Sequence, residues 1–362
     1  MEPPDDDALA SEGFVVFGEA LVSVDELAHG TRLTATRQVC RVRSSTRRAV
    51  VKVISVLGND DGTGDTSRLD FAHREPLLYE RGLPDTYIEA SIELPRLLGR
   101  FERDDAVALW LEDIDGHSGA ALTPDNYAHI ARRLGRAHGR VSQGAGSDTF
   151  PWSRGFLPDY LASWSDAPWE KLTDDDAWSA PLIAANFSDR DRRELVQLCA
   201  ERDEMLSWAT RLPQTICHHD VWPNNVFDFD DHTTLIDWSF AGYGHLGADV
   251  GNLVTDSCGD LLQPTALLDE LDATVTAAYR GGLEDVGWAG DVRVVRLGIC
   301  ILAAKWCWLV PHMLGLAAAE SHGVYGGVPV DSDHLFSERA NMLRFYARLA
   351  DEARSLAGAL GM

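Results

Sequence analysis

The sequence predicts an α+β protein of two lobes: a small, mainly antiparallel β-sheet carrying one principal helix, followed by a larger, mainly helical lobe. β-branched residues are concentrated in the first third of the chain, which is typical of strands. After Gly116, apolar residues recur at helical spacing. The length of 362 residues exceeds what one hydrophobic core usually supports, which favours two lobes.

In the first third, residues 36–57 predict a β-hairpin, because β-branched residues flank the polar turn SSTRR. A loop rich in glycine and aspartate follows at 58–67, and the spacing of apolar residues then predicts a helix over 68–82. Residues 105–116 predict a further strand. Residues 1–13 are acidic and lack the basic start and apolar core of a signal peptide, so we expect a loose tail.

The rest of the chain predicts mainly helices. Residues 124–141 and 187–210 carry apolar stripes, and they begin beside suitable N-cap residues, Thr123 and Ser188. Between these helices the stretch 163–178 is polar and rich in tryptophan, and we interpret it as a surface loop or lid.

The stretch RLGICILAAKWCWLVPHMLGLAAA, residues 296–319, is apolar enough to resemble a membrane span. Lys305, Pro311 and His312 interrupt it near its middle. A buried C-terminal helix, kinked at Pro311, therefore fits better, and we expect no membrane association.

Charge and cysteine content narrow the partners and the compartment. The net charge of −25, with 57 acidic and 32 basic residues, disfavours nucleic acid, whose phosphates reward stripes of lysine and arginine. The simplest interpretation of this charge is a solubilising surface. Six cysteines without a C-x-x-C pair indicate reduced thiols in a cytoplasmic protein and no structural zinc.

A cluster of polar side chains lies in CHHDVWPNNVFDFDDHTTLIDW. Strands at 226–229 and 233–238, joined by a turn, would bring Asp220 and Asn225 close to Asp237. Converging carboxylates need a cation or a proton to offset their charge, and carboxylate and amide oxygens suit Mg²⁺. The simpler alternative is that these residues only cap turns, the usual role of Asp and Asn outside strands.

The spacing H-x-D-x-x-x-x-N, here His218, Asp220 and Asn225, is followed by I-D-W with Asp237. This pattern resembles the aminoglycoside phosphotransferase and choline kinase family of kinase-like enzymes, and the resemblance covers residues 28–255. It implies a bilobal protein-kinase-like fold in which Asp220 is the catalytic aspartate. It also implies that Asn225 and Asp237 bind Mg²⁺ beside ATP, with GTP as the alternative nucleotide.

A kinase-like site also needs a strand lysine for the nucleotide phosphates and a helix acid that pairs with this lysine. Lys52 lies in the apolar run AVVKVI, and Glu75 follows on the predicted first helix. Taken alone, Lys52 fits equally well as a strand lysine that reaches water. By the same resemblance LWLEDIDG is the hinge between the lobes, where the Glu112 carbonyl and the Ile114 N–H would meet the adenine edge.

The resemblance assigns supporting roles and shows two departures. His218 would brace the catalytic loop, and Asp249 would accept backbone N–H bonds from it. His219 stands where the family usually has glycine, which puts the loop geometry in question. The phosphate-covering loop 29–36 has a single glycine, Gly30, and lacks a G-x-G-x-x-G pattern.

The acceptor is the least determined part of the site. The family often takes hydroxylated amines, and Asp256 and Asp260, expected in a helix after the metal strand, are placed to neutralise an ammonium group. The alternative is that both are solvated helix acids. Lys305, Trp306 and Trp308 would line a pocket for a larger or less cationic acceptor, unless the two tryptophans belong to the core.

The leading hypothesis is an ATP- and Mg²⁺-dependent phosphotransferase that moves the γ-phosphoryl group to a hydroxyl of a small molecule, an antibiotic or a related hydroxylated or amine natural product. The first alternative is a kinase for Ser or Thr of a peptide in lanthipeptide-like biosynthesis, with residues 152–178 as a peptide groove. The second is an inactive kinase-like binding module. The expected domains are a nucleotide-binding N-lobe, 1–113, and a C-lobe, 114–362, with the catalytic loop, metal site and acceptor-binding helices.

Overall fold

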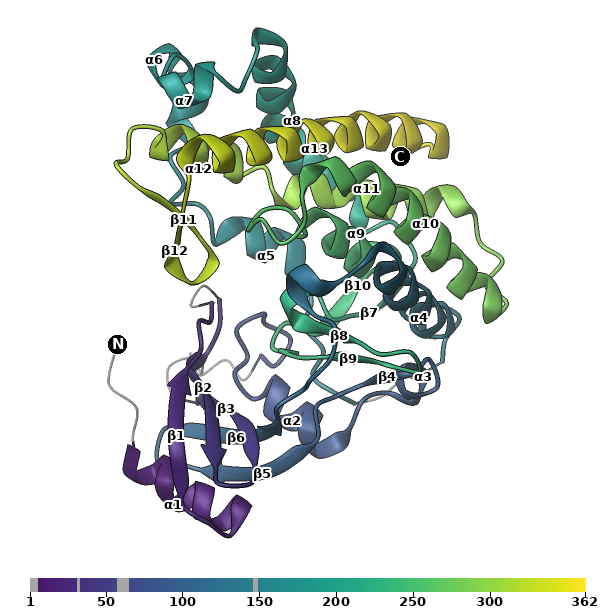
Figure 1. Cartoon of the computed structure of the whole chain (residues 1–362). Helices are drawn as coiled ribbons and strands as arrows, with labels where there is room; N and C mark the ends of the chain where they lie inside the picture. Colours follow the sequence, from purple (N-terminus) through teal and green to yellow (C-terminus); the bar gives the residue numbers. More distant parts are fainter. Residues whose placement is uncertain (1–5, 31–32, 57–64, 146–148) are drawn as a thin grey trace.

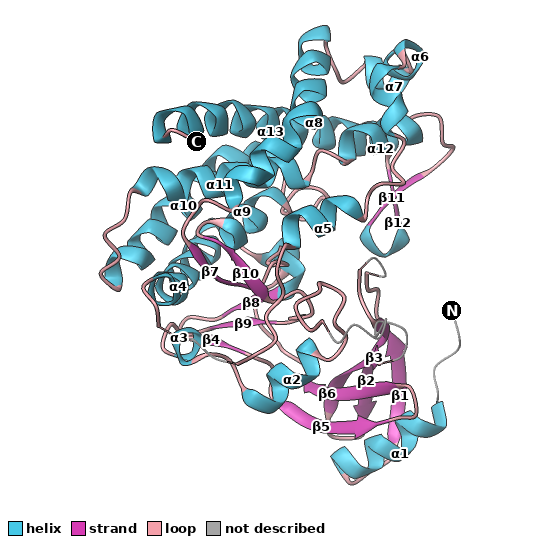
Figure 2. Cartoon of the chain, turned by 180° about the vertical axis from the view of Figure 1, so that it is seen from behind, coloured by secondary structure: helices cyan, strands magenta, loops and turns pink. Residues whose placement is uncertain are grey.

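The computed structural model describes residues 6–30, 33–56, 65–145 and 149–362. Two lobes are stacked one above the other, a β-sheet lobe and a mainly helical lobe (Figure 1, Figure 2). The sheet is antiparallel with strand order β1-β2-β3-β6-β5. Its strands are β1 (Leu21–Glu26), β2 (Thr36–Ser44), β3 (Arg48–Ser55), β5 (Leu97–Glu102) and β6 (Ala106–Glu112). The predicted hairpin and the predicted third strand are therefore confirmed.

The expected loose N-terminal tail, residues 1–13, is wrong for residues 6 to 13, which belong to helix α1 (Asp6–Phe17). Leu9 is fully buried in the core of the N-lobe, where Phe17 meets the ring of Trp110 edge-on. Glu12 accepts hydrogen bonds from the Arg103 guanidinium and the Trp110 indole. This charge pairing lets an acidic segment pack against the sheet, because a buried carboxylate is stable only when it is paired.

Helix α2 (Arg74–Arg81) is shorter than the predicted 68–82, and residues 66 to 73 form turns. Arg74 explains the shortening. Its side chain is fully buried and donates to the backbone carbonyls of Leu69 and Ser239, which holds the preceding turns against the C-lobe. The predicted loop at 58–67 lies mostly outside the described residues.

Long helices form most of the C-lobe. Both predicted N-caps are confirmed, since the side chains of Thr123 and Ser188 accept the N–H of the third helical residue in capping boxes. Gly135 and Gly282 let two of the helices cross closely, because a Cβ at either position would collide with the other backbone. The helices are α4 (Pro124–Ser142), α8 (Asp189–Ala209), α9 (Ala248–Thr255), α10 (Leu268–Asp285), α11 (Val292–Lys305), α12 (Leu309–Leu316) and α13 (Ser332–Leu360).

The apolar stretch near the C-terminus is interrupted at residues 306 to 308, between α11 and α12. The predicted kink at Pro311 is wrong. Pro311 falls in the first turn of α12, where a missing N–H removes no helical hydrogen bond. Residues 292–316 are long and apolar enough to cross a membrane, but 83% of this window is buried inside the protein, as in the core helix of a globular fold.

The tryptophan-rich stretch 163–178 is not a loop throughout: after turns at 163–168 it forms η2 (Trp169–Thr173) and α6 (Asp175–Trp178). α5 (Phe156–Ala162) precedes this stretch and α7 (Pro181–Ala184) follows it. Trp178 is buried, and the Trp164 ring stacks on Trp308 with centroids 3.4 Å apart. The tryptophans therefore serve to pack these short helices on the C-lobe.

Short strands carry the polar cluster between the lobes. β7 (Gln214–Cys217) pairs with β10 (Gly242–His245), and β8 (Val226–Asp228) pairs with β9 (Thr233–Leu235). β4 (Ile92–Glu93) joins β9 in parallel, and α3 (Asp85–Ile88) before it packs on α4. A segment of the first 113 residues thus belongs to the C-lobe core, while the boundary at 113 stays a prediction. β11 (His322–Val324) and β12 (Val328–Val330) form a hairpin that reaches toward the N-lobe (Figure 1).

Candidate active site

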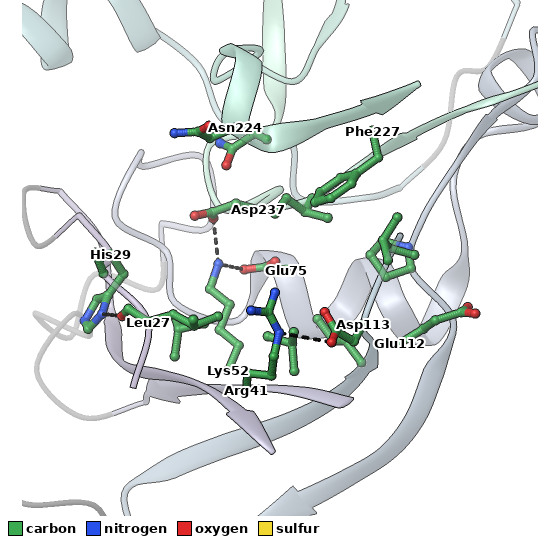
Figure 3. A pocket seen from close by; sticks show the side chains of 18 of the residues that line it. Leu27, His29, Arg41, Lys52, Glu75, Glu112, Asp113, Asn224, Phe227 and Asp237 are labelled. Carbon is green, nitrogen blue, oxygen red and sulfur yellow. Dashed lines mark hydrogen bonds and ion pairs between the residues drawn. The ribbon is translucent and has the colours of Figure 1, made fainter. Parts of the chain in front are cut away.

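A cleft of about 350 Å³ lies between the N-lobe sheet and the β8–β9 hairpin (Figure 3). The predicted hinge residues Glu112 and Ile114 both line it. A flat heteroaromatic ring suits such a site, with apolar walls and backbone groups at its edge. The apolar walls come from Val39, Val50, Leu111, Phe227 and Ile236.

Lys52 is the centre of the charged side of the cleft. Its ammonium lies 2.6 Å from Glu75 and 2.6 Å from Asp237 (Figure 3), so the predicted Lys52–Glu75 ion pair is present. Ser239 donates to both carboxylates and ties them together. Burial lowers the pKa of Lys52, but the charges of Asp237 and Glu75 outweigh burial and raise this pKa above its ordinary value. Lys52 therefore carries a permanent positive charge at neutral pH.

The catalytic loop is held by hydrogen bonds around Asp220. The Asn225 amide donates to the Asp220 carboxylate at 2.8 Å, which fixes the orientation of the acid. His218 lies 2.9 Å from the Ile236 carbonyl through one ring nitrogen and accepts the Asp220 N–H through the other. Asp249 accepts the backbone N–H of both His218 and His219 at 2.8 Å. The geometry at His218 and Asp249 is the one that the resemblance implies.

Asp220 is half-buried, and its environment is unusual for a carboxylate. Burial raises its pKa to about 7, and the nearby charge of Asp237 adds to this effect. The charge of Lys305 acts in the opposite direction. Asp220 is thus a carboxylate that titrates near neutral pH, as suits a proton acceptor.

His219 replaces the usual glycine at a cost to the backbone. Its φ is +70°, in the left-handed region that favours glycine. The ring stacks on Phe156 with centroids 4.4 Å apart. A Cβ at position 244 would lie only 2.6 Å from this ring, so Gly244 makes room for it. The left-handed loop is therefore kept, and packing offsets its strain.

Asn225 and Asp237 offer the oxygens that a hard cation prefers. Asn225 ends the turn η3 (Pro223–Asn225), and Asp237 lies two residues beyond β9, which is shorter than the predicted strand 233–238. Asp237 has a φ of +62°, a strained conformation typical of ligand sites. Its side chain is 40% exposed in the cleft that it lines, so it remains open to a cation. This donor set fits Mg²⁺.

The two acids assigned to the acceptor do not share a helix, contrary to expectation. α9 ends at Thr255; Asp256 caps it, and Asp260 lies in the following turn. Asp256 is buried and bonded to the Lys305 ammonium at 3.1 Å and the Trp306 indole at 2.7 Å. Its negative charge is therefore already compensated inside the protein.

Asp260 is also engaged. Its carboxylate accepts the backbone N–H of Tyr325 at 2.9 Å and lies 4.0 Å from the Arg339 guanidinium. Tyr325 comes from the turn of the β11–β12 hairpin and lines the cleft. Asp260 thus anchors this hairpin beside the site. An acceptor-binding role for either acid stays a prediction.

The side chains of the cleft that escaped the sequence analysis include Tyr325 and Trp222, whose ring centroids lie 5.0 Å apart. A signal for Tyr325 exists, because YGG between two valines is typical of a hairpin turn. A Cβ added at Gly30 would meet no described atom within 4 Å, and the adjoining residues 31–32 lie outside the described part of the chain, so the phosphate-loop assignment stays a prediction.

Comparisons with known proteins agree with this geometry. Residues 33–289 match the sequence model of the phosphotransferase enzyme family. No curated protein matches the chain.

Several solved structures share its fold. An amicoumacin kinase in complex with AMP-PNP and Ca²⁺ is 11% identical, with a TM-score of 0.56 over 96% of this chain and 94% of that one. A spectinomycin phosphotransferase in complex with ADP is 11% identical, with a TM-score of 0.55 over 97% and 98%. A choline kinase from Cryptosporidium parvum is 13% identical, with a TM-score of 0.51 over 92% and 90%. The bilobal kinase-like fold is confirmed, and with the match over residues 33–289 the chain belongs to the phosphotransferase enzyme family.

Proposed function

We propose that the protein is an ATP- and Mg²⁺-dependent enzyme that transfers the γ-phosphoryl group to a hydroxyl of a small molecule. One observation carries the proposal: Lys52, Asn225 and Asp237, from both lobes, line one cleft, and Asn225 donates a hydrogen bond to Asp220. An inactive binding module has no need of this complete set, and the convergence argues against it.

The nucleotide and metal residues have distinct roles in the proposal. Lys52, held by Glu75, binds the α- and β-phosphates, while the Glu112 carbonyl and the Ile114 N–H meet adenine or, in GTP, guanine. Asn225 and Asp237 would hold Mg²⁺, which supplies positive charge against the nucleotide phosphates when bound. Most of the rate comes from positioning and charge stabilisation, since phosphoryl transfer has a loose transition state.

Asp220 receives or orients the proton of the acceptor hydroxyl. Asn225 keeps its carboxylate in place, and His218 and Asp249 hold the loop that carries it. Phosphoryl transfer breaks the bond between the γ-phosphorus and the bridging oxygen and forms a new bond to the acceptor oxygen, while the hydroxyl proton passes to Asp220.

A small-molecule acceptor is favoured over a peptide. The peptide hypothesis depended on a groove at residues 152–178, and the short helices α5, η2 and α6 occupy much of this region, with Trp164 stacked on Trp308. Two of the structures with the same fold are named for antibiotic substrates, which supports an antibiotic or a related natural product as the acceptor class. The buried apolar helices and buried cysteines support a cytoplasmic enzyme.

Nucleotide binding tests the proposal first. Thermal unfolding is measured with Mg²⁺ and ATP, Mg²⁺ and GTP, and each nucleotide with EDTA. We expect Mg²⁺ and nucleotide together to stabilise the protein against thermal unfolding, and we expect Asp237→Asn to abolish this stabilisation.

ADP release is then screened against hydroxylated amines, uncharged hydroxylated compounds and Ser/Thr-rich peptides. Absence of stabilisation by both nucleotides would reject the enzyme, and ADP release with peptides alone would reject the small-molecule acceptor.

A further inference from the structure

Partly exposed aromatic side chains gather around Asp220. Trp222 lies two residues after it, and Tyr325 packs edge-on against Trp222 from the β11–β12 hairpin. Tyr325 and Trp222 both line the cleft, and burial together with the charges of Asp237 and Asp220 raises the pKa of Tyr325 to about 12. Burial also raises the pKa of Tyr160 on α5, and the charges of Asp256 and Asp220 act in the same direction. Half-exposed aromatic rings around a reactive carboxylate are typical of a surface that a ligand covers.

The β11–β12 hairpin holds Tyr325 at this place. His322 fixes its base through contacts with the Ser332 hydroxyl at 2.7 Å and the Leu316 carbonyl at 3.0 Å. At its turn, a Cβ on Gly326 would lie 3.1 Å from the Ala28 side chain of the N-lobe. The hairpin therefore spans from the C-lobe to the N-lobe beside the cleft, as Figure 1 shows for β11 and β12.

The charges on this side of Asp220 are compensated. The Lys305 ammonium binds Asp256 at 3.1 Å and lies 4.9 Å from the centre of the Tyr160 ring. Trp306 donates to the same Asp256 and keeps part of its ring exposed. Asp260 is occupied by the backbone N–H of Tyr325. Asp256 and Asp260, the two acids predicted to neutralise an ammonium group of the acceptor, are both already engaged inside the protein, which disfavours an acceptor with several positive charges.

We propose that the rings of Tyr160, Trp222, Trp306 and Tyr325 form the acceptor subsite, and that the acceptor is a hydroxylated compound with an aromatic or other flat apolar face and without several positive charges. This inference rests on the proposed function and names its substrate class. Flat faces stack on such rings, while the hydroxyl next to them reaches Asp220.

Binding to the full chain, saturated with Mg²⁺ and AMP-PNP, tests the subsite by isothermal titration calorimetry. One set of probes comprises aryl glycosides and nucleosides, which join hydroxyls to a flat ring. The other comprises aminoglycosides, which carry hydroxyls and several ammonium groups without such a ring. We expect the best aryl probe to bind about tenfold more tightly than the best aminoglycoside.

Variants at the hairpin make the test specific. Tyr325→Ala should weaken the best aryl probe about fivefold, and Tyr325→Phe, which keeps the ring, should restore most of the affinity. Phe14→Ala on α1, whose side chain is 59% exposed and remote from the cleft, is the control that should leave affinity unchanged.

Three results would overturn the subsite: tighter binding of aminoglycosides, no binding of any aryl probe at millimolar concentration, or unchanged affinity in Tyr325→Ala. Thermal stabilisation by Mg²⁺ and ATP is measured on the same preparations. If this stabilisation is present, any of the three results rejects the acceptor class alone; if it is absent, the proposed function itself is rejected.

Discussion

Lys52 in the N-lobe and Lys305 in the C-lobe have nearly the same surroundings. Both side chains are buried, and both ammonium groups lie against a carboxylate that is close to Asp220. The chain contains only one further lysine, Lys171, whose side chain is 38% exposed in a surface pair. Arginine supplies all other cationic side chains, so lysine is concentrated where a compact point charge is needed.

The difference between the two lysines lies in their partners. The side chain of Asp237, beside Lys52, is 40% exposed in the cleft, whereas that of Asp256, beside Lys305, is 9% exposed. Three aromatic rings also surround the Lys305 ammonium, including Tyr160 at 4.9 Å. In the ion pair with the exposed Asp237, a ligand can replace the carboxylate as the partner of the lysine. In the ion pair with the buried Asp256 no ligand can reach the lysine, so this pair serves the stability of the fold. The comparison therefore assigns chemistry to Lys52 and structure to Lys305.

The largest expected effect is on turnover, in Lys52→Met. Removing one preorganised positive charge at the phosphates should lower kcat by about 10²–10³-fold. Steady-state ADP release with the acceptor found in the screen measures it. Lys171→Met makes the same chemical change in a surface pair and should leave kcat unchanged. Equal losses in both variants would show that the effect is not specific to the cleft.

Lys305→Met should act on stability. It leaves Asp256 charged and buried without a cation, which should lower the free energy of unfolding by about 3 kcal/mol in urea titrations. Replacing both partners, in Lys305→Met with Asp256→Leu, should recover most of this loss. The comparison fails if Lys305→Met keeps its stability and loses turnover, because Lys305 would then be a ligand-binding cation.

The effect of pH separates the lysines from the histidines around them. The pKa values of both lysines are raised, so neither lysine titrates in mild acid. Burial lowers the pKa of His219 and of His245 from 6.5 to about 4. The unfolded chain then binds protons at these histidines first as the pH falls, so their contribution to stability is full above about 6.5 and decreases by roughly 3 kcal/mol per histidine toward pH 4, while the raised pKa of Asp220 acts in the opposite direction.

Urea titrations at several pH values measure this slope. The slope should be the same in the parent protein and in Lys171→Met, because this exposed lysine pairs with a surface aspartate. In Lys305→Met the slope should become smaller, because loss of this cation raises the pKa values of Asp220 and Asp256 and lets both acids take up protons in the folded state. An unchanged slope in Lys305→Met would show that Lys305 does not compensate these carboxylates and would weaken the comparison.

How far the sequence predicts each pair depends on its separation along the chain. Asp220, Asn225 and Asp237 lie within one loop and hairpin, and Lys52 and Glu75 lie on a strand and the next helix, so spacing and local pattern place them. Lys305 and Asp256 are 49 residues apart in different segments, and nothing local predicts that they meet. The ion pair between Lys305 and Asp256 was missed for this reason, and an acceptor-binding role for Asp256 stays a prediction.

Some features that the sequence analysis missed or mispredicted could have been found from the local sequence pattern. Asp228 looks incidental in the sequence, yet it is 1% exposed and accepts from Arg133 at 2.7 Å. Val226 is buried on the same strand, and alternate residues of a strand share a face, so a buried Asp228 follows from Val226. The kink expected at Pro311 ignored the tolerance of a first helical turn for proline. The two helix caps and the strands β2, β3 and β6, which depend on local chemistry alone, were predicted correctly, whereas β1 and β5 were not predicted.

The smallest expected effect is on the acceptor, in Asp260→Ala. Like Asp256, Asp260 is engaged inside the protein, but its carboxylate accepts the backbone N–H of Tyr325 and pairs with no lysine. Its loss should loosen the hairpin by about 1 kcal/mol, the value of one hydrogen bond, and raise the acceptor KM by roughly fivefold with kcat nearly constant. Asp260→Asn keeps an acceptor oxygen for this N–H and should retain most of the affinity. If Asp260→Asn were as impaired as Asp260→Ala, the negative charge itself would matter, and Asp260 would bind the acceptor as the sequence first predicted.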